Sequence, residues 1–268
     1  MIVSIGVDPV AFSILGFEVR WYGLLAVVAV AVALAIVRAG MRRDGITDGL
    51  LENGAIVVGV AALVGGRILF LLQNDPAMFF TDPLHALAVW HGGLSFYGGL
   101  ALGVVALWAY ARYSRIGFAH AADLAAPAIA AGQAIGHLGC LVGGDSYGLP
   151  ANGPLAVVYA NPGAMAPQGI PLHPTQLYEA ASLGLLAVIL WVSRDRLGRR
   201  GQGAVAATYL VGNAAIRFVL FFLRDDVVVL GGLKVAQLIA IGIALVGAAW
   251  LVALWRPAHR PTAQEVHP

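Results

Sequence analysis

The feature that most constrains this chain is a series of long apolar stretches that carry almost no charge. A transmembrane helix needs roughly 20 mostly apolar residues, at about 1.5 Å of rise each. Seven segments meet this requirement, at about residues 21–37, 52–73, 93–111, 119–142, 174–193, 203–223 and 233–255. Only 11% of the residues are charged, against about 25% in a soluble domain, so the composition excludes a water-soluble fold of this length. The sequence therefore predicts an all-α membrane protein with seven transmembrane helices.

The basic residues fall on alternate sides of these predicted spans. Eleven of the 16 Lys and Arg residues follow the first, third, fifth and seventh spans: Arg38, Arg42, Arg43, Arg112, Arg115, Arg194, Arg196, Arg199, Arg200, Arg256 and Arg260. The loops at 74–92 and 143–173 contain none. Because cytoplasmic loops carry the excess of Lys and Arg, we expect the N-terminus outside the cytoplasm and the C-terminus inside. Residues 1–255 would then form one polytopic domain with a periplasmic loop at 143–173, followed by a cytoplasmic tail at 256–268.

Two arginines lie inside predicted spans. An arginine at the middle of a helix costs about 2.5–3.5 kcal/mol on insertion scales, so such residues are candidates for a functional site. Arg67 is late in the second span and Arg217 is late in the sixth, and both spans run outward. Asn213 precedes Arg217 by one turn, and Arg224 follows it by two turns on the same helical face. A structural ion pair with Glu179 is one interpretation. The other is that two buried cations against one carboxylate bind an anionic ligand such as a phosphate.

Further polar groups fall at the same outer depth, namely Tyr22, Tyr97, Tyr178, Glu179, His137 and Asp145. Structural explanations exist for several of them: tyrosines are common at the membrane interface, and His137 would fit a hydrogen-bonded core histidine. Arg224 would equally fit an interfacial ion pair with Asp225 or Asp226. The single cysteine, Cys140, excludes an internal disulfide and a cysteine-based zinc site, and it is expected to be a small packing residue.

Two motifs flank the predicted periplasmic loop. Gly132, Gly136, Gly139 and Gly143 recur along the fourth span at a spacing that lets another backbone approach closely. The segment His173-Pro174-Thr175-Gln176-Leu177-Tyr178-Glu179 opens the fifth span, with proline in the position that suits a first helical turn. The N-terminus of that helix would point outward, and its partial positive charge would add to an anion-binding region.

From about Asp8 to Trp255 the sequence resembles the prolipoprotein diacylglyceryl transferases, a family of bacterial inner-membrane enzymes. The resemblance rests on motifs whose order and spacing agree with the family: Arg20-Trp21-Tyr22-Gly23, Gly65-Gly66-Arg67, His91-Gly92-Gly93-Leu94-Ser95-Phe96-Tyr97-Gly98-Gly99, the Gly136–Gly148 segment, His173-Pro174-Thr175-Gln176-Leu177-Tyr178-Glu179, and Arg217 with Arg224.

The resemblance implies a transferase that moves a diacylglyceryl group from phosphatidylglycerol to the thiol of a lipoprotein signal-peptide cysteine and releases glycerol phosphate. Its partners would be phosphatidylglycerol, prolipoprotein signal peptides and membrane lipids, with no nucleic acid, metal or cofactor, and the chain would act as a monomer. The site would face the outer leaflet of the inner membrane. We expect Arg217, His137, Tyr97 and Tyr22 to be catalytic, and Arg67, His137, Asp145, Gly148, Gln176, Tyr178, Glu179, Asn213 and Arg224 to bind substrate.

The chain departs from the family pattern at several site positions. The family signature has arginine where His137 stands, asparagine at Cys140 and Gly143, and glutamate at Asp145, while well-studied members have histidine at Tyr97 and glutamate at Phe221. A histidine with a pKa near 6.5 is charged only part of the time. Either Arg67, Arg217 and Arg224 supply enough positive charge, or substrate binding has changed.

Three other functions remain as alternatives. A transporter would need polar groups through the full bilayer depth, whereas the inner half of these spans is mostly apolar. A bis-histidine haem protein would need two histidines at matching depth, and of His85, His91, His120, His137 and His173 only His137 is well inside a span. The third alternative is a relative that has lost catalysis and binds only lipid or signal peptides.

Overall fold

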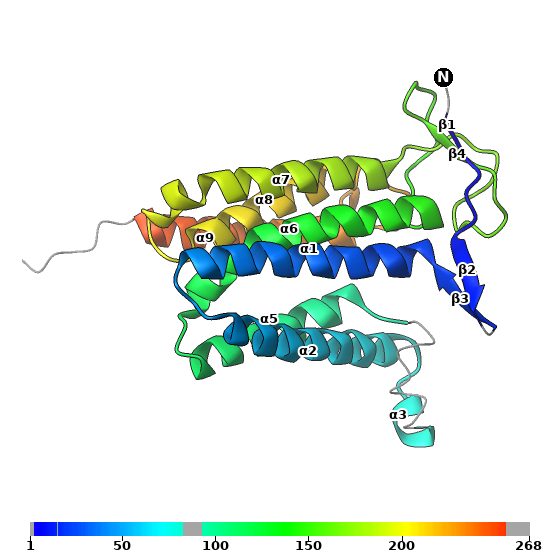
Figure 1. Ribbon diagram of the computed structural model, residues 1–268. Coiled ribbons are helices and arrows are strands. Elements are labelled where there is room, and N and C mark those ends of the chain that lie inside the picture. The colour runs from blue at the N-terminus through cyan, green and yellow to red at the C-terminus, as the bar shows by residue number, and fades with distance from the viewer. Residues whose placement is uncertain (1–2, 15, 83–92, 256–268) are drawn as a thin grey trace, which may run out of the picture.

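Long helices lie side by side in the computed structural model, which describes residues 3–14, 16–82 and 93–255 (Figure 1). Five of the described helices are long and apolar enough to cross a membrane: α1 (Trp21–Arg43), α2 (Asp48–Asn74), α6 (Phe118–Gly143), α7 (Thr175–Gly198) and α9 (Val235–Trp255). The chain is therefore a multi-pass membrane protein built mostly from helices. The tail at 256–268 and the His91-Gly92 pair of the third motif lie outside the described residues.

The remaining helices are shorter. α5 (Phe96–Tyr113) has 18 residues, α8 (Ala204–Leu220) has 17, and α3 (Met78–Thr81) has four. At about 1.5 Å per residue, α8 is a few ångströms shorter than a hydrocarbon core of about 30 Å. The predicted count of seven spans, and the side on which each terminus lies, therefore remain predictions.

The helices pack as two groups on either side of α1. In Figure 1, α2 and α5 form a hairpin on one side of α1, and α6, α7, α8 and α9 lie on the other side. Within the hairpin, Gly65 and Gly98 bring the two backbones together so closely that a Cβ on either residue would collide with the other's carbonyl oxygen. Such close approach through small residues is a common basis of helix association in lipid.

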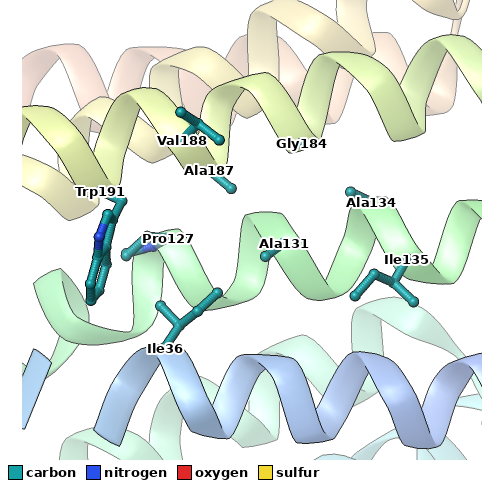
Figure 2. A pocket seen from close by; sticks show the side chains of 9 residues that line it. All are labelled: Ile36, Pro127, Ala131, Ala134, Ile135, Gly184, Ala187, Val188 and Trp191. Atoms are coloured by element: carbon teal, nitrogen blue, oxygen red, sulfur yellow. The ribbon is translucent and has the colours of Figure 1, made fainter. Parts of the chain in front are cut away.

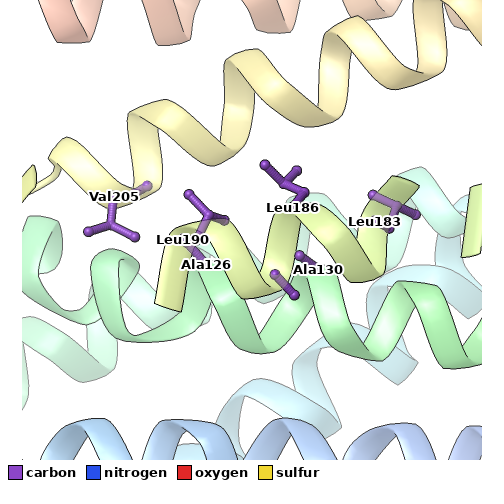
Figure 3. Close-up of a cluster of buried hydrophobic side chains, with 8 residues drawn as sticks. Ala126, Ala130, Leu183, Leu186, Leu190 and Val205 are labelled. Atoms are coloured by element: carbon purple, nitrogen blue, oxygen red, sulfur yellow. The ribbon is translucent and has the colours of Figure 1, made fainter. Parts of the chain in front are cut away.

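The group with α6 and α7 contains both a groove and a packed core. An apolar groove follows the junction of α1, α6 and α7 (Figure 2). On the far side of that junction, leucines of α7 interdigitate with alanines of α6 and with Val205 of α8 (Figure 3). Asp123 of α6 accepts hydrogen bonds from the backbone nitrogens of Gly203 (2.6 Å) and Ala206 (2.8 Å), which satisfies free amides at the start of α8.

Short strands accompany the helices. β1 (Val3–Ile5) pairs in parallel with β4 (Val157–Tyr159), β2 (Val10–Ile14) pairs antiparallel with β3 (Phe17–Arg20), and β5 (Val228–Leu230) pairs antiparallel with β6 (Leu233–Lys234). β1 to β4 gather at the end of the bundle where α1 begins, opposite the end where α9 finishes (Figure 1). They lie outside the apolar spans and are too short to show a clear alternating pattern.

Candidate functional site

The loop that follows α6 is fastened to the first turn of α7 by buried side chains. Thr175 Oγ1 donates to the carbonyl of Ser146 (2.7 Å), and Gln176 Nε2 donates to the carbonyl of Asp145 (2.6 Å) and to the Tyr159 hydroxyl (3.3 Å). Tyr159 in turn donates to the carbonyl of Leu141 (3.0 Å). Burial raises the pKa of the Tyr159 phenol to about 12, so it stays protonated and remains a donor. These bonds fix the ends of α6 and α7 relative to each other.

One turn further along α7, Glu179 is almost completely buried and faces cations from two directions. The carboxylate has 1% side-chain exposure, with Oε2 at 2.8 Å from His137 Nδ1 and Oε1 at 3.7 Å from Arg224 Nη1. The His137 contact lacks hydrogen-bond alignment, and neither oxygen accepts an aligned bond from the part of the chain that the structure describes. Glu179 therefore interacts with His137 and Arg224 through charge, and its carboxylate oxygens can still accept hydrogen bonds.

Phe221 brings Arg217 into the same cluster. Its ring is 3% exposed and lies 5.7 Å from the guanidinium carbon of Arg217 and 4.6 Å from that of Arg224. Both distances are within the range of a cation–π contact. Phe221 thus places one aromatic ring in contact with both arginines.

The route of the chain to Arg224 differs from the sequence-based expectation. We expected Arg224 two turns above Arg217 on one helical face, but α8 ends at Leu220, so the helical-face argument is wrong. Arg224 instead lies in an extended segment that forms an isolated bridge with Gly148. Among the described residues, Arg224 forms its ion pair with Glu179 rather than with Asp225 or Asp226.

Two side chains hold the end of α8 in place: Lys234, the last residue of β6, and Gln237, in the first turn of α9. The Lys234 ammonium is 8% exposed and donates to the carbonyls of Phe221 (2.7 Å) and Arg224. Gln237 Nε2 donates to the carbonyl of Phe218 (3.0 Å). These donors satisfy carbonyl groups that a helix end leaves without intrahelical partners, and they fix the backbone that carries Arg224.

Gly148 and Gln176 both lie in contacts that hold the loops and helix ends together. The Gly148 backbone nitrogen donates to the carbonyl of His173 (3.0 Å). A Cβ on Gly148 would lie 2.7 Å from the His173 carbonyl oxygen, the His173 Cβ and the Leu223 carbonyl oxygen. Gln176 has no exposed surface and uses its amide in the loop contacts described above. A role of either residue in substrate binding stays a prediction.

Asn213 belongs to a buried polar layer one turn below Arg217. Its Nδ2 donates to Gln133 Oε1 (2.9 Å) and to the Tyr209 hydroxyl (3.3 Å), and that hydroxyl donates to the same Gln133 oxygen (3.0 Å). The layer ties α6 to α8 beneath the arginines.

Arg67 lies in the other helical group. It is 7% exposed, its Nη1 donates to the carbonyl of Gly93 (3.3 Å), and its guanidinium carbon is 5.7 Å from the ring of Phe70. α2 packs mainly on α5 and less extensively on α1. Glu179 thus contacts His137 and Arg224, and Phe221 links Arg224 to Arg217, while Gly93 and Phe70 contact Arg67.

The other predicted residues lie around the same end of the bundle. Tyr22 is the second residue of α1 and is 55% exposed, with its Cδ2 3.2 Å from the Cβ position of Gly139 on α6. Tyr97 is the second residue of α5. The Cys140 Sγ is 3.9 Å from Asp145 Oδ2, and the Tyr178 ring is 6.3 Å from that of His173.

Sequence reasoning missed Tyr159, Thr175, Lys234 and Gln237, all of which support the site. Lys234 carried a usable signal, because it stands alone at the start of an apolar run on the side expected to be poor in cations. Tyr159 carried none, since it lies in a polar loop far from its partners in the sequence.

Comparison with known proteins identifies relatives over most of the chain. Residues 9–253 match the family model of the prolipoprotein diacylglyceryl transferases. A Bordetella parapertussis protein named phosphatidylglycerol–prolipoprotein diacylglyceryl transferase is 34% identical over 266 residues, covering 95% of this chain and 98% of its own. Proteins of the same name from Aromatoleum aromaticum and Methylococcus capsulatus are 36% and 31% identical over 261 and 265 residues, covering 91% and 95% of this chain and 96% and 98% of their own. The chain therefore belongs to the prolipoprotein diacylglyceryl transferase family.

Proposed function

We propose that this chain transfers the diacylglyceryl group of phosphatidylglycerol to the thiol of a lipoprotein signal-peptide cysteine and releases glycerol phosphate. The names of the relatives support this reaction, and so does the chemistry of the cluster around Glu179. Both substrates reach the site from the bilayer, which accords with a site built between membrane helices.

The observation that carries the proposal is a buried carboxylate that gathers basic side chains at one end of the bundle. Glu179 lies 2.8 Å from His137 and 3.7 Å from Arg224, and the Phe221 ring contacts both Arg217 and Arg224. Guanidinium groups gathered in an apolar setting favour an anion, and they bind phosphate oxygens in bidentate fashion. The phosphodiester of phosphatidylglycerol is such an anion.

In the proposed reaction, the cysteine sulfur attacks the carbon of the diacylglycerol moiety that carries the phosphate oxygen. A sulfur–carbon bond forms, the carbon–oxygen bond to phosphate breaks, and negative charge develops on the leaving phosphate oxygen. Arg217 and Arg224 stabilise that charge, which is the kind of interaction that contributes most in a water-poor site. Glu179 positions both cationic groups.

The attacking sulfur must lose its proton, because the thiolate is the nucleophile. Glu179 engages His137 through Nδ1, which leaves Nε2 as the ring nitrogen that can accept the thiol proton. We assign this step to His137, with Tyr22 and Tyr97 assigned to orient the peptide and the phosphate. Arg67 is assigned to the lipid headgroup on the α2–α5 side.

The proposed setting is the bacterial inner membrane, crossed seven times by a monomer with its N-terminus outside. The alternation of basic segments along the sequence supports this orientation, and it places the Glu179 cluster in the outer leaflet.

The test is a transfer assay with purified protein, phosphatidylglycerol and a peptide that bears a lipoprotein cysteine, read as mass gain of the peptide. Wild-type protein should add the diacylglyceryl mass. Arg217→Gln should reduce the rate by about 10²–10³-fold, as loss of a transition-state charge stabiliser does, while the protein still purifies from the membrane. Arg42→Gln, at the exposed opposite end, is the matched control. An Arg217→Gln protein with full activity would contradict the proposal.

A relative that binds lipid or signal peptide without transfer is the second candidate, and His137 in place of the family arginine favours it. Complementation of a transferase-depleted bacterium separates the two functions. Growth with the wild-type chain supports the enzyme, whereas growth only with His137→Arg supports the binding protein.

A further inference from the structure

The β2–β3 hairpin carries apolar side chains on one face. Side chains alternate between the two faces along a strand, and residues directly opposite each other on antiparallel strands share a face. The register pairs Ile14 with Phe17 and Phe12 with Val19. These four apolar side chains therefore lie together on one side of the hairpin.

The other face of the hairpin is polar. Ser13 is paired with Glu18, one step along each strand from the apolar pairs. Glu18 and Arg20 alternate onto this same face and form an ion pair at 3.4 Å, with side chains 57% and 56% exposed. Charged groups that are so exposed need water or lipid headgroups around them. The hairpin therefore has one apolar face and one hydrated face.

The described part of the chain leaves the apolar face largely uncovered. Phe12, Ile14 and Phe17 are 46%, 56% and 78% exposed, and the main contacts of the hairpin are between its own strands and with α1. A two-stranded hairpin on its own is at best marginally stable in water. Because burial of apolar area is the dominant favourable contribution to folding, this hairpin needs a second surface against its apolar face.

The base of the hairpin is fixed to the start of α1, a helix long and apolar enough to cross a membrane. β3 ends at Arg20 and α1 begins at Trp21, and the Trp21 backbone nitrogen donates to the Pro9 carbonyl (3.0 Å). Trp21 and Tyr22 are 41% and 55% exposed, and tryptophan and tyrosine are enriched where a span meets water. The hairpin therefore starts at the membrane interface.

The direction of the hairpin keeps it near that interface. In Figure 1 it turns away from the line of α1, toward the side of the bundle on which α2 lies. Further along α1, Val27 and Val28 are 69% and 48% exposed and face lipid in a membrane. A strand pair that starts beside this lipid-facing helix, with its charges on the opposite side, has the same division that holds amphipathic elements in the interface.

We propose that the β2–β3 hairpin is an interfacial anchor, with its apolar face inserted among the lipid chains of the leaflet at which α1 begins. Its polar face is turned to headgroups and water. The hairpin contacts the hydrocarbon of the lipid, so no particular headgroup charge is required. The anchor does not depend on the transferase reaction, and it sets the depth of the first turn of α1, which carries Tyr22.

The test measures the depth of single spin labels on the full-length protein in lipid vesicles. Cys140 is the only cysteine, so Cys140→Ala gives a background in which one new cysteine is labelled at a time. For each label, the collision rate with oxygen, which concentrates in hydrocarbon, is compared with the collision rate with a neutral, water-soluble nickel complex. Labels are placed on the apolar face by Phe12→Cys, Ile14→Cys and Phe17→Cys, and on the polar face by Ser13→Cys and Glu18→Cys.

We expect the ratio of oxygen to nickel collisions to be several-fold higher for labels on the apolar face than for labels on the polar face. Val28→Cys, on the exposed side of α1, is the lipid control. Asn152→Cys, in the exposed loop after α6, is the water control. The ratio on the apolar face should approach that of the lipid control, and the ratio on the polar face should approach that of the water control.

One variant tests the cause of the insertion. Phe17→Asp places a carboxylate on the apolar face, so the nickel collision rate of the label at Ile14→Cys should rise several-fold as the face leaves the hydrocarbon. Ser13→Asp adds the same charge to the polar face and is the matched control, which should leave that label unchanged. If Phe17→Asp fails to fold, the five labels without it still decide the outcome.

Labels that show no alternation between the two faces would overturn the proposal. Labels on the apolar face that are as open to nickel as Asn152→Cys would also do so, because the face would then be available to a protein partner. Labels shielded from both collision partners would overturn it too, since the chain itself would then cover the face. Arg217→Gln separates the anchor from the transferase, because it should lose peptide transfer and keep the pattern of collision rates.

Discussion

Both ends of the helix bundle carry ion pairs, and the shortest of those in the described residues, Arg38 to Asp48 at 2.6 Å, is at the end without the candidate site. At the end where α1 meets α2, Arg38 and Arg42 contact Asp48 at 2.6 and 2.8 Å, with side chains 32–60% exposed. At the end where α7 begins, Arg224 is 3.7 Å from Glu179, with exposures of 16% and 1%. Exposed pairs contribute little to stability, whereas a buried, imperfectly paired charge is costly. Burial therefore distinguishes the functional end better than distance does.

The largest expected effect tests the buried end directly. Glu179→Gln keeps the size of the side chain but leaves His137, Arg217 and Arg224 without their shared carboxylate. We expect the transfer rate to fall by about 10²-fold or more, because small misplacements of catalytic groups have effects of that size. The rate is measured as mass gain of the acceptor peptide.

The contrast between the two ends would be wrong if Glu179→Gln kept both the transfer rate and the unfolding temperature of the wild-type chain. Burial would then not mark function at this end. Glu179→Asp is a useful companion, since it retains the charge and shortens the reach to His137.

A smaller effect is expected where backbone segments meet beside the cluster. Gly148→Ala places a methyl group 2.7 Å from the His173 and Leu223 carbonyl oxygens, and neither backbone segment can move without shifting the chain that leads to Arg224. Overpacking of this kind costs about 1–3 kcal/mol. We expect about a tenfold loss of transfer rate and a lower unfolding temperature.

Gly153→Ala provides the matched control, because nothing lies within 4 Å of its Cβ position. It should retain both the activity and the unfolding temperature of the wild-type chain. Similar losses in the two variants would show that the loop tolerates no side chain anywhere, and would remove the specific argument for Gly148.

The long helices could be predicted from the sequence, whereas the short strands and one helix end could not. The long helices were predictable because apolar stretches of about 20 residues have one stable arrangement in lipid. The strand pairing of residues 3–5 with 157–159 was not, because it joins short segments far apart in the sequence. The end of α8 at Leu220 was also missed, since the apolar stretch continues through Leu223.

The residues of the candidate site could be predicted from the sequence, but fewer of their contacts could. Arginines, a histidine and a glutamate inside apolar spans indicate a site, because ionisable groups in the membrane cost free energy. The structure brings Arg217, Arg224, His137 and Glu179 together. Sequence spacing could not assign Arg67 to the α2–α5 hairpin or reveal the Phe221 ring between two arginines. Those facts depend on tertiary packing.

A smaller effect is expected at the support beneath the cluster. Tyr159→Phe removes the donor to Leu141 and the acceptor for Gln176. Loss of a buried hydrogen bond costs about 1 kcal/mol, so we expect the unfolding temperature in detergent to fall by about 2–4 °C with most of the activity retained.

The effect of Tyr159→Phe should also depend on pH. The folded-state pKa of Tyr159 is raised to about 12, above its usual value, so the protonated phenol stabilises the fold fully below pH 10. This contribution is lost as the pH rises from about 10 to 12. The difference in stability between the variant and the wild-type chain should therefore shrink over that range, and a constant difference would contradict the assignment.

The smallest effect is expected at the end where α1 meets α2. Asp48→Asn removes the partner of Arg38 and Arg42 at the shortest ion-pair distance of this end, yet all three side chains reach solvent. Because exposed pairs are screened by water and salt, the transfer rate should stay within about twofold of wild type and the unfolding temperature should be unchanged. A loss of activity comparable to that of Glu179→Gln would reverse the comparison, since distance rather than burial would then mark the end that matters.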